Sequence, residues 1–372
     1  MTSRRTVLSP RNALTLAVVV ALAAVPVVLG RYWAFVAATA VGFALYALSI
    51  VVITGFTGQI SLAQASIGGV GAFFASAAIY QLGLPYFVGI AAGVLTAVAV
   101  SLVLGLPSLR LRGLQLAVAT WSFTLFTDRF IFVWDKLGYK GLSGVPLKRP
   151  VIAGINFADD TRYYYLLLAV GIVVFWLVRN LRDSGAGAAL NLVRDDEVAA
   201  ASMGVHVARA KLAAFAVSGA IAGLAGIVMA SLVSRVLAVS YSPIVSVNLL
   251  AIAVIGGVRL IGGAVLAGAM FAAVPELLRV FRELQGERWL LFLGVFLILI
   301  QRLGTQGLAG GLQQLWAAVR GTPPAVTPAR PPDMAPAAVR RRRSVNGSRP
   351  DRRPVVARPG RVAALLAEEV TV

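Results

Sequence analysis

Long apolar runs follow one another through most of this chain and are separated by short polar stretches. A bilayer core needs about 20 apolar residues for one helix, and fewer where a helix is broken or sheltered by protein. The pattern therefore predicts an all-α polytopic membrane protein with about eight to ten transmembrane or broken helices. The candidate spans are Ala13–Gly30, Ala34–Ile53, Ile60–Tyr80, Tyr86–Leu106, Leu114–Trp134, Tyr163–Val178, Leu212–Val233, Ile244–Val258, Gly262–Val280 and Trp289–Ile300.

Composition supports this prediction and excludes several classes of protein. Hydrophobic residues make up 59% of the chain, charged residues only 13%, and the mean hydropathy is +0.84, which a soluble domain would not show. The chain has no cysteine and one histidine, His206, so it has neither a disulfide framework nor a thiolate or multi-histidine metal site. We assign His206 no role.

The two ends of the chain differ from the region between them. Residues 1–33 read as an N-terminal cytoplasmic segment with a retained first span, because the apolar run is long for a cleaved signal. Residues 34–302 form the main membrane domain. Residues 303–372 are rich in Pro, Ala and Arg, which predicts a disordered basic tail with affinity for anionic lipid headgroups rather than nucleic acid.

The distribution of basic residues predicts the orientation. Cytoplasmic loops carry an excess of Lys and Arg, and Arg4, Arg5 and Arg11 place the N-terminus inside. Ten spans then place the polar stretch 179–211, Arg259 and the tail on the cytoplasmic side. The loop from Asp135 to Arg162 falls outside although it also carries cations. We expect a bacterial plasma-membrane protein with both termini in the cytoplasm.

One predicted span carries polar residues at membrane depth. Gly55 and Gly58 suit a break in a helix, and freed backbone groups can then line a cavity. We interpret this segment as a translocation path or a subunit contact; the alternative is close packing through small residues. The candidate path residues, two of them from the span after Pro107, are Thr57, Gly58, Gln59, Ser61, Gln64, Gln115 and Thr120.

The polar stretch 179–211 predicts two short helices, Ala186–Leu192 and Asp195–Met203, with Asp195 or Asp196 as the N-cap of the second. Gly204 follows, where a helix-terminating glycine belongs. The second helix is rich in alanine and poor in charge for a helix facing water. It is therefore suited to docking into a cleft on a soluble partner, although an ordinary solvated loop helix remains the alternative.

Two glycine patterns predict packing or turns. Gly219, Gly223 and Gly226 would form a tightly packed helix face, and two glycine pairs around Arg259 would form a tight hairpin.

Motifs that are missing from the sequence also bear on its function. The sequence has no GxxxxGK[ST] phosphate-binding loop, and inside its predicted spans it has neither a run of acids nor paired carboxylates for catalysis. We therefore do not expect an enzyme, the lack of acids argues against a carrier that couples ions through buried carboxylates, and we expect the energy source to lie on another chain.

Taken in order, six motifs resemble the permease subunits of branched-chain amino acid ABC importers of the LivM type. The similarity runs from about residue 34 to 300. The motifs are Gly58–Leu62, Pro107–Gly113, Gly141–Pro146, Arg194–Gly204, Lys211–Gly226 and Val254–Gly257.

The resemblance implies partners for this chain. They would be ABC ATPase subunits that bind the ATP, a second permease subunit, homologous or LivH-like, and an extracytoplasmic solute-binding protein; the chain itself would hold no cofactor. The polar stretch would be a coupling loop, and the residues implied to contact the ATPase are Asp195, Asp196, Glu197, Ala199, Ala200 and Gly204.

Departures from the family pattern leave the solute open. Ala63-Gln64 stands where relatives commonly have Gly-His, and Gln115 where they have an aromatic residue. Branched-chain or related amino acids and small polar amides all remain candidates. The alternative function is a self-sufficient secondary carrier of small polar solutes.

Overall fold

The computed structural model of the protein describes residues 10–111, 113–134, 137, 144–152, 155–280 and 295. The chain divides into two compact units, Met1–Pro323 and Pro324–Val372, and all the described residues belong to the first. The predicted tail 303–372 lies outside the described residues, as does the last predicted span apart from Val295.

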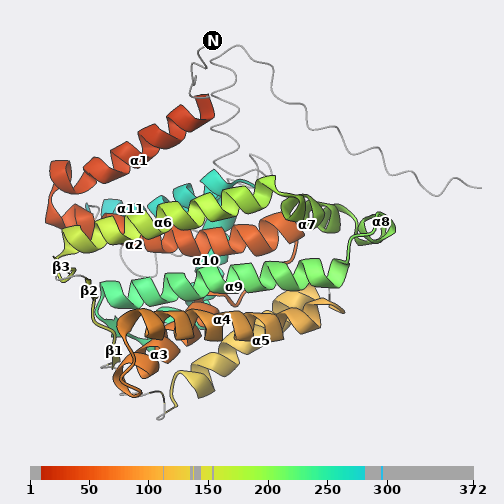
Figure 1. Ribbon diagram of the computed structural model, residues 1–372, viewed down its shortest axis with the longest axis horizontal. Helices are drawn as coiled ribbons and strands as arrows, with labels where there is room; N and C mark the ends of the chain where they lie inside the picture. Colours follow the sequence, from red (N-terminus) through yellow and green to blue (C-terminus); the bar gives the residue numbers. More distant parts are fainter. Residues whose placement is uncertain are drawn as a thin grey trace, which may run out of the picture. The chain divides into compact units, whose positions relative to one another are not determined.

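Helices account for most of the described chain, which confirms the all-α prediction (Figure 1). The helices are α1 (Pro10–Leu29), α2 (Arg31–Ile50), α3 (Gln64–Tyr80), α4 (Tyr86–Ser108), α5 (Leu114–Phe126), α6 (Asp160–Asp183), α7 (Gly185–Asp195), α8 (Glu197–Ser202), α9 (Val207–Leu232), α10 (Pro243–Gly256) and α11 (Ile261–Val280). Two π-turns, η1 (Val51–Gly55) and η2 (Thr127–Ile131), extend α2 and α5, and a 3-10 turn, η5 (Ala238–Tyr241), precedes α10.

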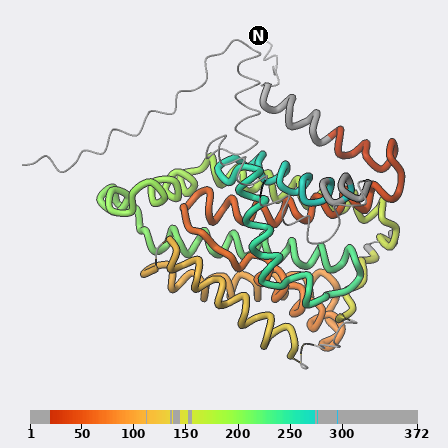
Figure 2. Tube along the Cα trace, turned by 180° about the vertical axis from the view of Figure 1, so that it is seen from behind, coloured from red at the N-terminus to blue at the C-terminus, as the bar shows by residue number. Residues whose placement is uncertain are grey.

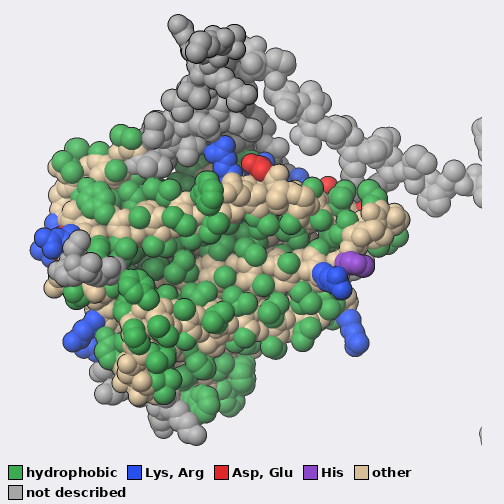
Figure 3. Space-filling view, viewed as in Figure 1, with side chains coloured by type: hydrophobic (Ala, Val, Ile, Leu, Met, Phe, Trp, Pro, Cys, Tyr) green, Lys and Arg blue, Asp and Glu red, His purple; other side chains and the backbone are tan. Residues whose placement is uncertain are grey.

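Four helical segments of the described chain are long and apolar enough to cross a membrane, namely Arg31–Gly55, Tyr86–Ser108, Asp160–Asp183 and Val207–Leu232. Shorter apolar helices cover Val20–Leu29, Pro243–Gly256 and Ile261–Ala273. Hydrophobic side chains cover most of the face in Figure 3, with basic side chains at its left and right edges and a few charged side chains along its upper edge. This distribution suits a protein that spans a bilayer.

Small residues bring α3, α4 and α9 close together. A Cβ at Gly226 would overlap the carbonyl oxygen of Gly68 in α3, and a Cβ at Gly219 would overlap the Ser101 side chain in α4. The predicted small-residue face of α9 is therefore confirmed as a packing surface. On the other side of the bundle, α11 packs along α2 and contacts α10 (Figure 2).

The two ends of the bundle are built differently (Figure 1). At one end lie α7 and α8. At the other, β1 (Val145–Pro146) pairs antiparallel with β4 (Arg235–Val236), and β2 (Val151–Ile152) pairs with β3 (Ile155–Asn156). Ion pairs tie the strand end together: Arg31 meets Asp160 at 3.2 Å, and Arg149 meets the same carboxylate at 2.8 Å.

Several predicted boundaries differ from the observed ones, and at two helix starts the backbone shows why. The span predicted to begin at Ile60 begins as α3 at Gln64, because Gly58 is left-handed (φ 70°) and the chain stays non-helical as far as Ala63. The second loop helix was predicted over Asp195–Met203 but is α8, Glu197–Ser202. Asp195 instead ends α7, and the extended backbone of Asp196 (φ −157°) separates the two helices.

Candidate functional site

Residues 58–63 form an irregular segment between the helical end of α2 and η1 and the start of α3, where the sequence predicts a broken helix. The backbone N–H of Gly58 donates to the Thr54 carbonyl at 3.0 Å, and the Thr54 hydroxyl donates to the Gln59 carbonyl at 3.0 Å. Thr57 is buried, and its hydroxyl donates to the Ile53 carbonyl. The break is thus held by specific hydrogen bonds, and it presents non-helical backbone beside the bundle core.

A buried polar cluster follows the break at the start of α3. The hydroxyl of Ser49 in α2 donates to Oε1 of Gln64 at 3.0 Å, and the hydroxyl of Ser218 in α9 donates to the Ser49 carbonyl at 2.8 Å. The Gln64 amide nitrogen donates to the Ser61 hydroxyl at 3.4 Å. The cluster joins three helices through their interior faces. Because Ser49 and Ser218 are isolated hydroxyls in apolar runs, sequence reasoning did not select them.

Gln59 is the exception among the polar residues of the break. Its side chain is buried, yet neither Nε2 nor Oε1 has a hydrogen-bond partner. Leaving a buried polar group unpaired costs about 1–3 kcal/mol, so such a group in a native fold calls for an explanation. A primary amide both donates and accepts hydrogen bonds. It can therefore contact a polar solute whether that solute presents a donor or an acceptor.

The two candidates from α5 separate in the structure. Thr120 is buried, and its hydroxyl accepts a hydrogen bond from the backbone N–H of Leu62 at 3.1 Å, which joins α5 to the break. Gln115 is exposed in the first turn of α5 and does not join this cluster. Ser61, Gln64 and Thr120 are thus brought together with the break, whereas Gln115 is not.

The polar stretch 179–211 folds as two capped helices. The hydroxyl of Ser184 accepts from Gly187 N–H at the start of α7, and the carboxylate of Asp196 accepts from Val198 N–H at 2.8 Å and Ala199 N–H at 3.1 Å. The bond from Ala199, followed by the bond from Val198, lowers the pKa of the Asp196 carboxyl. Gly204 is left-handed (φ 84°), as a glycine after a helix often is.

The outward face of α8 differs from the set of residues that the family motif suggests. Ala200 is fully buried against the chain, and Glu197 and Ala199 are half-buried. The exposed side chains are those of Val198, Ala201, Ser202 and Met203, with Val198 76% exposed and Met203 63% exposed. The exposed surface of α8 is therefore largely apolar, which suits contact with a partner.

A buried lysine fixes the base of α8. Nζ of Lys211, in α9, lies 2.7 Å from a carboxylate oxygen of Glu197, and the lysine side chain is only 3% exposed. The same ammonium donates to the Ser108 carbonyl at the end of α4, at 3.4 Å. The ammonium therefore joins α8 to the ends of two transmembrane helices.

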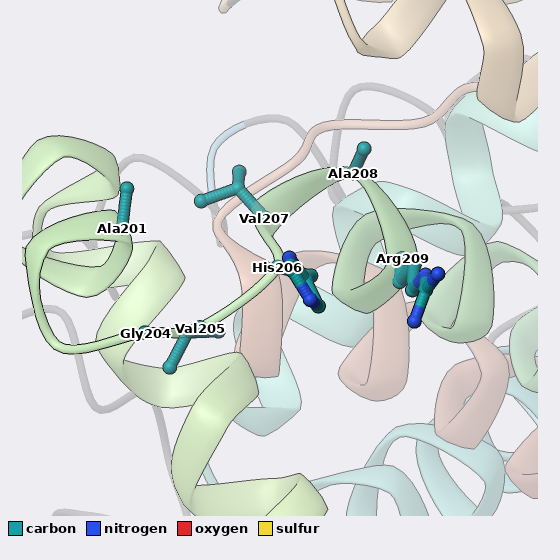
Figure 4. A pocket seen from close by; sticks show the side chains of 7 residues that line it. All are labelled: Ala201, Gly204, Val205, His206, Val207, Ala208 and Arg209. Carbon is teal, nitrogen blue, oxygen red and sulfur yellow. The ribbon is translucent and has the colours of Figure 1, made fainter.

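A hollow of about 460 Å³ lies where α8 turns into α9 (Figure 4). Its lining runs from Ala201 and Gly204 to the first turn of α9, and it includes the exposed side chains of His206 and Arg209. Among the residues that the structure describes, no three His, Cys, Asp or Glu side chains lie close enough together to hold a metal ion.

Comparison with known proteins shows what the chain as a whole is similar to. The chain is 28% identical over 318 residues to the high-affinity branched-chain amino acid transport system permease protein LivM of Salmonella typhimurium, covering 79% of this chain and 73% of that protein. It is also 28% identical to LivM of Escherichia coli K12 over 317 residues, 78% of this chain and 73% of that protein. No solved structure matches. The family described as branched-chain amino acid transport system, permease component, matches residues 32–301, and the chain belongs to this family.

Proposed function

We propose that this chain is the permease subunit of an ATP-driven ABC importer, in which it forms half of the translocation path. Its family membership supports the transport role, and the apolar face of α8 supports docking to an ATPase. The chain holds no cofactor in this proposal, because ATP is bound by the ATPase subunits. A second permease subunit, homologous or LivH-like, and an extracytoplasmic solute-binding protein complete the importer.

The observation that carries the proposal is the combination of an exposed face and a fixed base on α8. Val198 and Met203 face outward, while Glu197 is paired at 2.7 Å with the buried Lys211. A helix that only covered the membrane domain would turn its apolar residues inward. A helix that is anchored on one side and apolar on the other can receive a force from a partner and pass it on to the spans.

The proposed solute is a branched-chain or related amino acid or a small polar amide. The unpartnered amide of Gln59 offers both a donor and an acceptor for such a solute. In this proposal the protein lies in the bacterial plasma membrane, with α7, α8 and both chain termini in the cytoplasm.

Docking can be tested by placing charge on the exposed face of α8. Val198→Asp and Met203→Asp, singly and together, should prevent the ATPase subunits from co-purifying with the permease, because a carboxylate would lose its hydration in an apolar interface. The matched control is Val239→Asp, which changes an equally exposed valine (70%) at the strand end. ATPase retention by the double variant would refute the docking role.

The alternative, a self-sufficient carrier, makes the opposite prediction for transport. Proteoliposomes containing the full complex should accumulate radiolabelled leucine, isoleucine or valine only when ATP is present on the α8 side. Uptake by the purified chain alone, driven by an ion gradient, would establish the carrier and remove the importer from consideration.

A further inference from the structure

Arg194 connects the two candidate sites, although they lie far apart in the sequence. It stands in the last turn of α7, and its Nη1 donates a hydrogen bond to the carbonyl of Gly55 at 2.9 Å. Its Nε and Nη2 contact one carboxylate oxygen of the exposed Asp195, each at 3.0 Å. A single guanidinium therefore contacts Asp195, next to α8, and Gly55, the last residue of η1 before the break.

Packing reinforces this hydrogen bond. A Cβ at Gly58 would lie 2.9 Å from Cγ of Arg194, so the aliphatic part of the arginine rests directly on the backbone of the break. On the other side, a Cβ at Gly55 would overlap the carbonyl oxygen of Val258, in the turn between α10 and α11. Arg194 thus contacts the backbone at Gly58, and that turn contacts it at Gly55. A displacement of Arg194 cannot leave it unaffected.

Electrostatics favours the same arrangement. The carbonyl groups at the C-terminal end of a helix carry partial negative charge and lack helical partners, so a cation there is stabilising. The Gly55 carbonyl closes η1, the extension of α2, and Arg194 supplies that cation. Lys211 forms a different connection, since its contacts are Glu197 and the end of α4 rather than the break.

We propose that Arg194 is the positioning residue that transmits movement of α7 and α8 to the break between η1 and α3, which would line the translocation path. This inference rests on the proposed function, because the movement would come from the ATPase subunits. The contacts on Gly55 and Gly58 give the movement a direct route from α7 to the segment that carries Gln59.

The absence of native cysteine allows a clean test. One reporter is Ile60→Cys, at an exposed position inside the break (39%); the other is Val198→Cys, at an exposed position on α8. Each is introduced into the full complex, and the rate of maleimide labelling is measured without nucleotide, with ATP, and with ATP and vanadate. Each reporter is then combined with Arg194→Gln, with Arg194→Lys, and with the control Arg182→Gln, which changes an exposed arginine at the end of α6.

With Arg194 intact, nucleotide should change the labelling rate at both reporters. Arg194→Gln should leave the response at Val198→Cys unchanged and reduce the response at Ile60→Cys about tenfold, the size of one lost hydrogen bond to a charged group. Arg194→Lys keeps a cation and an aliphatic stem, so it should restore part of the response. Arg182→Gln should match the parent.

The outcomes separate the two proposals. If nucleotide changes neither reporter in the Arg194 parent, the importer function fails. If both reporters respond in the parent and the Ile60→Cys response survives Arg194→Gln, only the role of Arg194 is overturned. Should Arg194→Gln prevent assembly, Gly58→Ala displaces the same arginine from the other side of the contact. A normal Ile60→Cys response in an assembled Gly58→Ala complex would likewise overturn the inference.

Discussion

Gly58 is constrained both by its own backbone conformation and by the side chain of a neighbouring residue. Its φ of 70° lies in the left-handed region, and Arg194 occupies the space next to it. Any L-residue there would carry the left-handed penalty, about 1–2 kcal/mol, and would also have to displace the arginine stem. The position therefore requires glycine for two independent reasons.

Gly58→Ala should therefore lower the stability of the protein more than an alanine substitution at another left-handed glycine that has no side chain next to it. The control is Gly83→Ala, at φ 64°, where a Cβ would have nothing within 4 Å. We expect both variants to lose about 1 kcal/mol or more from backbone strain, and Gly58→Ala to lose more. Thermal unfolding of the purified permease in detergent measures the difference, and equal losses would show that Arg194 does not press on Gly58.

The ion pair between Lys211 and Glu197 leads to a second prediction about single residues. Removing one partner of a buried pair leaves a charge without compensation and costs several kcal/mol, less where the pair is partly exposed. The lysine side chain is 3% exposed and the glutamate side chain 24%. Glu197→Ala should therefore destabilise the protein more than Lys211→Met does, because the Glu197 carboxylate that remains in Lys211→Met can turn toward water.

Combining Lys211→Met with Glu197→Ala should recover part of the stability lost in Glu197→Ala alone, because the stranded ammonium is then absent. Denaturant unfolding of the two single variants and the double variant measures this coupling. Strictly additive losses would mean that the two side chains act independently, despite their 2.7 Å separation.

How far the sequence reveals single residues depends on their surroundings. Gln59 and Gln64 could be selected because an amide in an apolar run is conspicuous, and both are buried at the break. Arg194 could not, because an arginine in a polar loop looks like any other solvated cation. Only the fold, which brings Gly55 and Gly58 to α7, shows what the side chain contacts.

At the scale of elements, α8 depends on its N-cap. The two backbone bonds that lower the pKa of the Asp196 carboxyl stabilise its charged form. A group whose folded pKa is depressed contributes stability above its unfolded pKa, and that contribution is lost as the pH falls through the folded value.

Asp196→Asn keeps a capping oxygen but removes the charge. Comparing the two proteins therefore isolates the pH-dependent part of the cap's contribution to stability. The melting temperature of the Asp196 protein minus that of Asp196→Asn should be constant near neutral pH. It should then shrink toward zero in acid as the Asp196 carboxyl takes up its proton. A difference that stays unchanged down to the lowest pH at which the protein folds would contradict the role of the charge.

The small-residue face of α9 leads to a further prediction. A Cβ at Gly226 would overlap the backbone of Gly68, which has no side chain that could move aside. We expect Gly226→Ala to cost about 1–3 kcal/mol from overpacking and to separate α3 from α9. Gly262→Ala is the control, since a Cβ there meets nothing within 4 Å and alanine favours a helix. Equal thermal stabilities for the two variants would show that α3 and α9 separate without cost.

Element boundaries were less predictable than element types. Apolar runs located the spans, but they could not show that η1 and η2 end two helices as π-turns, or that α3 starts four residues late at Gln64. Helices that are apolar on every side leave no periodicity to mark which face is buried. In the loop, by contrast, the capping rules narrowed the N-cap of α8 to Asp195 or Asp196 and identified Gly204, because caps are local.

For the described unit as a whole, the length of α9 can be compared with the thickness of the bilayer. α9 has 26 residues, which corresponds to roughly 39 Å at 1.5 Å per residue, more than the hydrocarbon thickness of about 30 Å. It begins beside α8 and ends at the strand end next to β4. Val198 and Val239 should therefore lie on opposite sides of the membrane.

The orientation can be measured because the chain has no native cysteine. Val239→Cys should react with a membrane-impermeant maleimide in intact spheroplasts, because Val239 is 70% exposed at the strand end. Val198→Cys, 76% exposed on α8, should react only after the membrane is permeabilised. The cysteine-free parent gives the background for both measurements. If Val198→Cys reacted in intact spheroplasts and Val239→Cys did not, α8 would face away from any cytoplasmic ATPase. Docking through α8 and transmission through Arg194 would then fail together.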